Sequence, residues 1–396
     1  MTRGTLKNLW ALDEDFIFLN HGSYGACPKA ILAEQQDWHM RIERQPVKFY
    51  KREYIPLVVE IRSQIQKFFD ASTYEIAFVQ NATTGVNTVL KNLHISKGSE
   101  VLCGEYTYGA CLNALKYYCS AKGLKLVTVP IPFPLQSSEQ IIDAYSEKIS
   151  KKTKLVLLDH VSSPLGLIYP IKDLIRLMKA RDIFTLVDGA HAPGMLNVDL
   201  DKLGADAYVG NFHKWMCSPK SIAFLALNRN GIKEVLNQAQ RGLVIGHGCE
   251  EAGNKYSLLL QDTDWPGTLD PSPLLCLPKV LRYLPSVLGT WNAVYESNHL
   301  LLEQAYETIC NFLEVEMPCP KSMLGTMAAI PLPKAKPYEG PIDPLQDLLF
   351  HKEKIEVPIF ETANGKRYLR ISAQLYNSLE HYEKLIEALK KWIAST

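Results

Sequence analysis

Short apolar runs alternate with amphipathic stretches through the first two thirds of the chain. This alternation is typical of strands and helices that build a mainly parallel α/β sheet. Helical periodicity is clearest at residues 110–122 and 171–181. We therefore predict seven strands, at residues 76–79, 100–103, 124–129, 155–159, 183–188, 207–210 and 223–227.

The pattern changes near both ends of this region. Residues 20–25 are rich in turn formers and predict an irregular N-terminal arm, residues 1–29, on the substrate side. After residue 272 a helical stretch runs with interruptions to residue 313. A proline-rich segment, a strand at 368–372 and an amphipathic helix at 379–393 follow. We predict a large domain at residues 30–272 and a smaller α+β domain at 273–396, against which the arm packs.

Composition limits the classes of function. The 396 residues include 43 Lys and Arg against 42 Asp and Glu, so no basic excess indicates a nucleic-acid partner. No apolar run could span a bilayer, and no signal-peptide core is visible. Nine scattered cysteines without a CxxC pair indicate reduced thiols, not disulfides or a metal site. We expect a cytoplasmic protein without a membrane partner.

Candidate chemistry lies where predicted strands end. Asp188 closes one very apolar run, and Lys214 follows the next between aromatic residues that would desolvate it. Upstream, Thr83 and Thr84 open a helix directly after a strand, which suits a phosphate. Each signal alone has a structural explanation, as a turn cap, a surface lysine or a helix cap. Together they indicate pyridoxal phosphate, whose aldehyde a desolvated lysine attacks.

These motifs resemble the fold-type I pyridoxal-phosphate enzymes, specifically the class V aminotransferase superfamily. The resemblance runs from residues 18–25 to 369–372. It is most specific at Asp-Gly-Ala-His-Ala, residues 188–192, and at His213-Lys214. Within the superfamily the chain is similar to the branch of isopenicillin N epimerase and related carbon–sulfur lyases. The implied fold is a large domain around a mainly parallel seven-stranded sheet, with a smaller C-terminal domain.

The resemblance implies roles for cofactor-binding residues. Lys214 would form the internal aldimine and later carry the Cα proton, while Asp188 would keep the pyridine nitrogen protonated. The phenolic oxygen would meet His191 and Ser163. The phosphate would bind Ala82, Thr83 and His213.

It also implies substrate and partner contacts. Arg370 would bind the substrate carboxylate, for which a guanidinium fork is suited. The substrate side would be lined by Asn20, His21 and Tyr24. Thr268 would reach the phosphate of a neighbouring subunit, which implies a homodimer. Arg241 and His247 are left open between substrate contact, partner contact and solvated loop.

Two positions depart from commoner relatives. The usual ring-stacking histidine is replaced by a tyrosine, for which Tyr106 aligns best and Tyr108 is next. Cysteine desulfurases carry a reactive cysteine shortly before the carboxylate-binding arginine. This chain has no cysteine from Pro320 to Arg370, so persulfide formation is not expected.

The resemblance leaves the reaction open. Reprotonation on the opposite face gives an epimerase like isopenicillin N epimerase, which we place first. Expulsion of a β-substituent gives a cysteine-type C–S β-lyase, and reprotonation at the cofactor gives an aminotransferase. A catalytically inactive scaffold is the non-enzyme alternative, and the joint presence of Lys214, Asp188, His213 and Arg370 argues against it.

Overall fold

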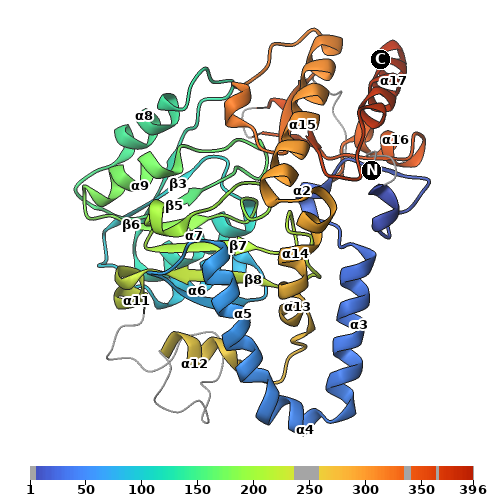
Figure 1. Cartoon of the computed structure of the whole chain (residues 1–396). Helices are drawn as coiled ribbons and strands as arrows, with labels where there is room; N and C mark the ends of the chain where they lie inside the picture. The colour runs from blue at the N-terminus through green and yellow to red at the C-terminus, as the bar shows by residue number, and fades with distance from the viewer. Residues whose placement is uncertain (1–5, 236–257, 334–339, 363–364, 396) are drawn as a thin grey trace.

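The structure is a computed structural model that describes residues 6–235, 258–333, 340–362 and 365–395. A seven-stranded sheet forms its centre, and helices surround it (Figure 1). No helix within these ranges is long and apolar enough to cross a membrane. Arg241 and His247, whose roles were left open, lie outside the described residues.

The seven predicted strands form the central sheet, which confirms the mainly parallel α/β fold. Their order in space is β2-β8-β7-β6-β5-β3-β4. β8 runs antiparallel to both of its neighbours, and the other neighbours pair in parallel. The strands are β2 (Glu75–Val79), β3 (Glu100–Gly104), β4 (Lys125–Val129), β5 (Thr153–Asp159), β6 (Phe184–Asp188), β7 (Ala207–Asn211) and β8 (Ala223–Leu227).

Each face of the sheet packs against its own helices. Leu155 and Leu157 of β5 share one apolar cluster with Val86 of α6. Val156 points the other way, into the cluster that contains Leu174 of α9. Burial on both faces explains why these strands are continuous apolar runs. The connecting helices are α6 (Ala82–Asn92), α7 (Gly109–Lys122), α8 (Glu139–Lys148), α9 (Ile171–Lys179), α10 (Leu200–Leu203), α11 (Arg229–Val235) and α12 (Leu258–Asp264).

The N-terminal arm is more regular than its composition predicts. β1 (Ile17–Phe18) pairs in parallel with β10 (Ile355–Glu356), so the arm lies beside the C-terminal third (Figure 1). Residues 20–25 were predicted to be irregular, and this was wrong, because α2 (His21–Tyr24) forms one helical turn there. Gly22 N–H donates to Ser372 Oγ at 3.3 Å. A tertiary contact thus supports a turn that local propensity does not favour.

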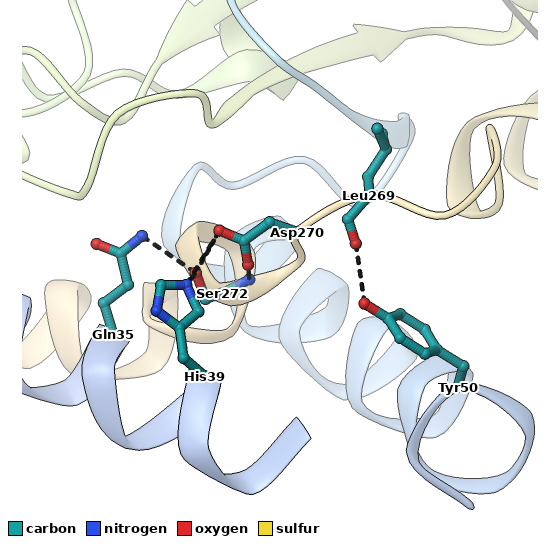
Figure 2. Close-up of polar contacts among 6 residues, drawn as sticks. All are labelled: Gln35, His39, Tyr50, Leu269, Asp270 and Ser272. Carbon is teal, nitrogen blue, oxygen red and sulfur yellow. Dashed lines mark hydrogen bonds and ion pairs between the residues drawn. The ribbon is translucent and has the colours of Figure 1, made fainter. Parts of the chain in front are cut away.

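After the arm, helices lead to the first sheet strand. They are α3 (Lys29–Arg44), α4 (Pro46–Lys48), the π-helix η2 (Phe49–Glu53) and α5 (Tyr54–Phe68). A shorter helix, η1 (Lys7–Leu9), lies within the arm itself, before β1. Figure 2 shows how the segment after α12 is tied to them. Tyr50 donates to the Leu269 carbonyl at 3.0 Å, and Ser272 Oγ lies 2.8 Å from His39 Nε2. These contacts hold residues 269–272 in place.

The C-terminal third contains the predicted helical stretch, strand and final helix. A three-stranded antiparallel sheet of order β11-β12-β9 packs with α15. β9 lies inside the proline-rich segment and was not predicted. The division at residues 29 and 272 remains a proposal. The elements are α13 (Ser272–Leu275), α14 (Leu277–Leu288), α15 (Trp291–Leu313), η4 (Lys321–Met323), β9 (Met327–Leu332), α16 (Pro344–His351), β11 (Ile359–Glu361), β12 (Arg367–Ser372) and α17 (Leu379–Ser395).

Candidate active site

A cavity of about 830 Å³ opens at the carboxyl ends of β5, β6 and β7, beside the start of α6. Ligand sites of open α/β sheets lie at this edge. Five predicted site residues do not line it: Asn20, His21, Tyr106, Thr268 and Arg370. The predicted residues that do line it are Tyr24, Ala82, Thr83, Tyr108, Ser163, Asp188, His191, His213 and Lys214.

Lys214 is held by the two aromatic residues of its own segment. Phe212 and Trp215 are fully buried, which anchors the chain after β7 and leaves His213 and Lys214 at the cavity. Burial lowers the pKa of Lys214 to about 8, while the nearby Asp188 charge acts in the opposite direction. The uncharged fraction of this amine near neutral pH is therefore far larger than that of an ordinary lysine, which favours its use as a nucleophile or base.

His191 contacts Lys214 in one defined tautomer. Trp215 Nε1 lies 3.3 Å from His191 Nδ1, and His191 Nε2 lies 3.0 Å from Lys214 Nζ. An indole N–H can only donate, so Nδ1 is the acceptor and the ring proton is on Nε2. Burial holds the pKa of His191 well below its usual range. The neutral ring can therefore donate from Nε2 to the Lys214 amine when that amine is uncharged.

Asp188 is a buried carboxylate without an ion-pair partner in the described ranges. It is 5% exposed and ends β6. The backbone N–H of Ala190 donates to its Oδ1 at 3.0 Å, and Cys111 Sγ lies 3.3 Å from its Oδ2. A buried carboxylate is costly unless a cation pairs with it. Cys111, on α7, was missed because nothing in the local sequence links it to β6.

A second carboxyl group lies beside Asp188. Asp159 ends β5, pairs with Asp188 in the sheet register and lines the cavity. Thr107 Oγ1 donates to it at 2.8 Å. Burial first, and then the Asp188 charge, raise the pKa of Asp159 to about 8. Asp159 was not among the predicted residues, although its position at a strand end is the same signal that identified Asp188.

The start of α6 lines one end of the cavity, with Ala82, Thr83 and Thr84. Asn81 caps the helix by accepting from Thr84 N–H at 2.8 Å. Ala82 N–H donates to Asn211 Oδ1 at 2.9 Å, so the predicted phosphate contact there already has a partner. Asn211, at the end of β7, was missed by the sequence analysis. The first turn of a helix offers N–H groups without intrahelical partners and the positive end of its dipole.

His213 lies at the same end of the cavity. Its Nδ1 lies 3.3 Å from the Ile222 carbonyl, which can only accept, so Nδ1 carries the proton. Burial, and then the charge of Lys214, lower the pKa of His213 to about 4. Its Nε2 must gain a proton before it can donate to a phosphate oxygen, and a nearby dianion favours that gain.

Arg370 lies on β12, next to the cavity. Its guanidinium donates to the Ser163 carbonyl, to Ser23 Oγ at 3.1 Å and to Asn20 Oδ1 at 3.3 Å. Its buried Nε has no hydrogen-bond partner. Arg370 is 7% exposed, and burial lowers its pKa to about 10. No carboxylate pairs with it in the described part of the chain. This is a site prepared for a ligand anion.

His21 lies behind Lys214 and not on the substrate side. It is fully buried, with Nε2 2.9 Å from the Lys214 carbonyl and Nδ1 2.8 Å from Tyr376 Oη. Because the carbonyl accepts, Nε2 carries the proton and Tyr376 donates to Nδ1. Nearby, Gly25 has φ 68°, and a Cβ there would collide with the His213 carbonyl. The arm is thus packed directly against the backbone of the lysine segment.

The two tyrosines after β3 differ in position. Tyr108 is 46% exposed and lines the cavity. Tyr106 is buried, and its ring packs edge-on against Phe133 at 6.4 Å between centroids. Tyr106, which aligned best for ring stacking, therefore does not line the cavity, whereas Tyr108 does. Thr268 is exposed and lines no part of the cavity.

A serine, a histidine and an aspartate also cluster outside the cavity (Figure 2). Ser272 Oγ and Asp270 Oδ2 both contact Nε2 of His39, at 2.8 and 3.1 Å. A hydrolytic triad needs the carboxylate on one ring nitrogen and the hydroxyl on the other. Here both share one nitrogen, so the cluster is a structural link between α3 and α13.

The site can be compared with known proteins. The family model described as aminotransferase class V matches residues 22–384. The chain belongs to the class V aminotransferase family. Within this family, a probable chloroplastic L-cysteine desulfhydrase of Arabidopsis thaliana is 31% identical, with 95% of this chain and 83% of that protein covered.

Two further comparisons bear on activity and fold. An isopenicillin N epimerase of Amycolatopsis lactamdurans is 28% identical over 96% of both chains. A cysteine desulfurase structure from Thermococcus onnurineus NA1 superposes with a TM-score of 0.81 at 20% identity, covering 99% of this chain and 98% of that one. The class V protein is thus a pyridoxal-phosphate enzyme with the expected fold.

The residues present fit this cofactor. Asp188 offers an unpaired buried carboxylate to a cationic ring nitrogen. Lys214 offers an amine of lowered pKa, and the start of α6, at Thr83, offers the positive end of the helix dipole to a phosphate. These groups line one cavity from different sides.

Proposed function

We propose that this class V enzyme is a cysteine-type C–S β-lyase that uses Lys214 to take the Cα proton of an amino acid. The sequence-based prediction placed an isopenicillin N epimerase-like activity first, and relatives carry both names. We place elimination first because it needs a single acid–base group at Cα. The Lys214 amine, which lines the cavity with a lowered pKa and contacts neutral His191, is the observation that carries the proposal.

The cofactor would be oriented by residues at opposite sides of the cavity. Bound pyridoxal phosphate withdraws electrons from Cα and so makes its proton acidic. Asp188 would hold a proton on the ring nitrogen, and Tyr108 would cover one ring face. His191 Nε2–H and Ser163 would lie near the phenolic oxygen. The phosphate would sit between the first turn of α6, with Ala82 and Thr83, and His213.

The substrate carboxylate would bind Arg370. The guanidinium is already fixed by Ser163, Ser23 and Asn20, so little conformational entropy is lost when a ligand binds. The free Nε–H would donate to one carboxylate oxygen. Tyr24, which is exposed at the rim, would be the outermost contact. His21 supports the lysine backbone in this proposal.

Lys214 would then act as the base. Its Nζ takes the proton from Cα, and the C–S bond breaks with the electron pair leaving on sulfur. Overall, L-cysteine and water give pyruvate, ammonia and hydrogen sulfide, with no net oxidation. The His191 Nε2–H would donate to the uncharged amine and so hold it in position.

The first experiment measures the elimination products and the exchange of the Cα hydrogen in one reaction. The purified holoenzyme is incubated with L-cysteine in deuterated buffer, and pyruvate, sulfide and Cα deuterium are measured. Pyruvate and sulfide in equal amounts support the lyase. Borohydride reduction followed by peptide mass analysis should place the cofactor on Lys214. Absence of pyruvate and sulfide with L-cysteine would contradict the lyase proposal.

Epimerisation is the second candidate because Tyr108 could serve as an acid at Cα. Tyr108 lines the same cavity, and burial raises its pKa, so the phenol is protonated at neutral pH. Cα deuterium incorporation without pyruvate, across an amino-acid panel, would favour this candidate. Formation of the D-amino acid, measured on a chiral column, would identify it.

We further infer a homodimer in which Thr268 reaches the partner's cofactor phosphate. Thr268 is exposed on a segment held in place by Tyr50 and Ser272, which would suit contact with a second chain. Sedimentation of a fully active monomer would contradict this inference. A cytoplasmic location remains a prediction, and a relative is named as chloroplastic.

A further inference from the structure

Beside the cofactor cavity lies a second hollow of about 400 Å³, which we call the outer hollow. It lies among the loop after β3, the loop after β5, and strands β11 and β12. Tyr108 and Ser163 line both spaces and so mark their common boundary. The outer hollow therefore adjoins the place where the reaction is proposed to occur.

Arg370 connects the outer hollow to the substrate. It lines the outer hollow and not the cofactor cavity, and its buried Nε has no hydrogen-bond partner. A substrate whose carboxylate binds Arg370 and whose Cα reaches Lys214 must cross the boundary between the two spaces. The outer hollow then offers room for a substituent that begins at Cβ.

Phe360 lies on the same face of its sheet as Arg370. β11 and β12 are antiparallel, and Phe360 pairs with Tyr368, which is two residues before Arg370. Side chains of paired residues, and of residues two apart on one strand, lie on the same side of a sheet. Both Phe360 and Arg370 line the outer hollow. One face of this sheet thus gives the outer hollow an apolar ring and the guanidinium proposed to bind the carboxylate.

Phe360 is one end of a row of four aromatic rings. It stacks on Tyr368, with ring centroids 5.8 Å apart. Tyr368 contacts Phe133 at 5.4 Å, and Phe133 contacts Tyr106 at 6.4 Å, both between centroids. Tyr106, at the other end of the row, also lines the outer hollow. The two inner rings are buried, so their packing holds Phe360 and Tyr106 in place as apolar walls of the outer hollow.

We propose that the outer hollow binds an apolar, ring-sized substituent on the substrate sulfur, and that Phe360 and Tyr106 contact it. The inference rests on the proposed C–S lyase function and names its substrate class: cysteine thioethers with an arylalkyl group. Elimination breaks the bond between Cβ and sulfur, and the thiolate that leaves takes up a proton. With water, such a thioether gives the thiol, pyruvate and ammonia. Contacts between aromatic rings add to the gain from burying apolar surface.

The test compares S-(2-phenylethyl)-L-cysteine with S-ethyl-L-cysteine, whose thiolates are leaving groups of similar basicity. Burial of the phenyl ring between two apolar walls favours the larger substrate. The kcat/KM for pyruvate release should therefore be about five- to fiftyfold higher for the phenylethyl compound. A ratio below this range would overturn the proposal.

Variants locate the preference. Phe360→Ala removes one wall, and the ratio of kcat/KM for the phenylethyl compound to that for the ethyl compound should fall by about three- to tenfold. Because both substrates are measured on one preparation, any loss of folded enzyme cancels in this ratio. Phe350→Ala, at an exposed position on α16, is the matched control and should keep the ratio within about twofold of wild type. An unchanged ratio in Phe360→Ala would contradict the assignment to this ring.

Binding is measured separately, so that the proposed lyase function can fail without deciding this inference. Dissociation constants of both thioethers are obtained from the visible absorbance of the cofactor in the holoenzyme. If neither compound yields pyruvate but the phenylethyl compound binds more tightly by the factor expected above, the lyase proposal fails and the outer hollow proposal stands. A smaller difference between the two dissociation constants would overturn the outer hollow proposal.

Discussion

The cofactor cavity has a smaller neighbour, the outer hollow of about 400 Å³, and the two spaces are built differently. The cavity is formed mainly at strand ends of one sheet, and its carboxylates Asp159 and Asp188 are buried with hydrogen-bond partners. The outer hollow lies between segments far apart in sequence: the loop after β3, the loop after β5, and strands β11 and β12. The difference suggests that chemistry shared by a family resides in the rigid sheet, and substrate choice in the loops around it.

The largest effect should come from the cavity. Lys214→Ala removes the proposed base, and kcat should fall by about 10³-fold or more, since positioned acid–base groups contribute roughly 10² to 10⁴. The borohydride-dependent label should disappear as well. Lys116→Ala, at an exposed position on α7, is the control. If Lys214→Ala keeps its turnover, Lys214 is not the base, and the cavity is not where the chemistry takes place.

The next largest effect should come from Arg370, and it should show whether substrate binding and cofactor binding depend on different residues. Arg370→Gln removes the proposed carboxylate contact, and kcat/KM should fall by about 30- to 5000-fold, because truncating one partner of a buried charge pair costs roughly 2–5 kcal/mol. The loss should appear mainly in KM. Cofactor affinity, measured by absorbance titration, should stay within about threefold of wild type. A large loss of cofactor affinity would mean that Arg370 belongs to the cavity.

The positions of Asp188 and Lys214 could be predicted because the sequence next to each residue contains the signal. Asp188 and Lys214 follow apolar runs, and the seven strands lie where those runs are. Arg370 required a family resemblance. The outer hollow could not be predicted, because its walls come together only through packing of distant loops. β9 was missed because Pro331 lies in it, and the order β11-β12-β9 shows why: proline is tolerated on an edge strand.

The third effect is on the pH dependence of the free energy of unfolding, and it comes from Asp159. The Asp159 carboxyl has a folded pKa of about 8, well above the ordinary value near 4. Between these values the folded state holds a proton that the unfolded state has lost. Asp159 therefore lowers the free energy of unfolding as pH rises, by up to ~1.4 kcal/mol per pH unit.

Asp159→Asn should flatten this slope. Urea unfolding of the cofactor-free protein between pH 5 and pH 8 measures it, with Asp143→Asn, at an exposed position, as control. Equal slopes in wild type and Asp159→Asn would show that Asp159 is ionised and that the cavity end is less enclosed than described.

The smallest effect distinguishes the two tyrosines. Tyr108→Ala should weaken cofactor binding by about two- to tenfold, the range expected for loss of an aromatic contact of ~0.5–1.5 kcal/mol. Tyr106→Phe should bind the cofactor within twofold of wild type, because its ring packs on Phe133. The reverse result would return the stacking role to Tyr106. Both affinities come from the same absorbance titration.

The contact of the N-terminal arm with the lysine backbone has a practical consequence. His21 hydrogen-bonds to the Lys214 carbonyl, and Gly25 packs closely against the His213 carbonyl, although both lie near the N-terminus. Cleavage or fusion near residue 20 would therefore act as an active-site mutation, although the reactive amine is almost two hundred positions away. Conversely, ligands that steady the lysine segment should slow protease cutting of the arm. Its digestion rate then serves as a label-free assay of site occupancy.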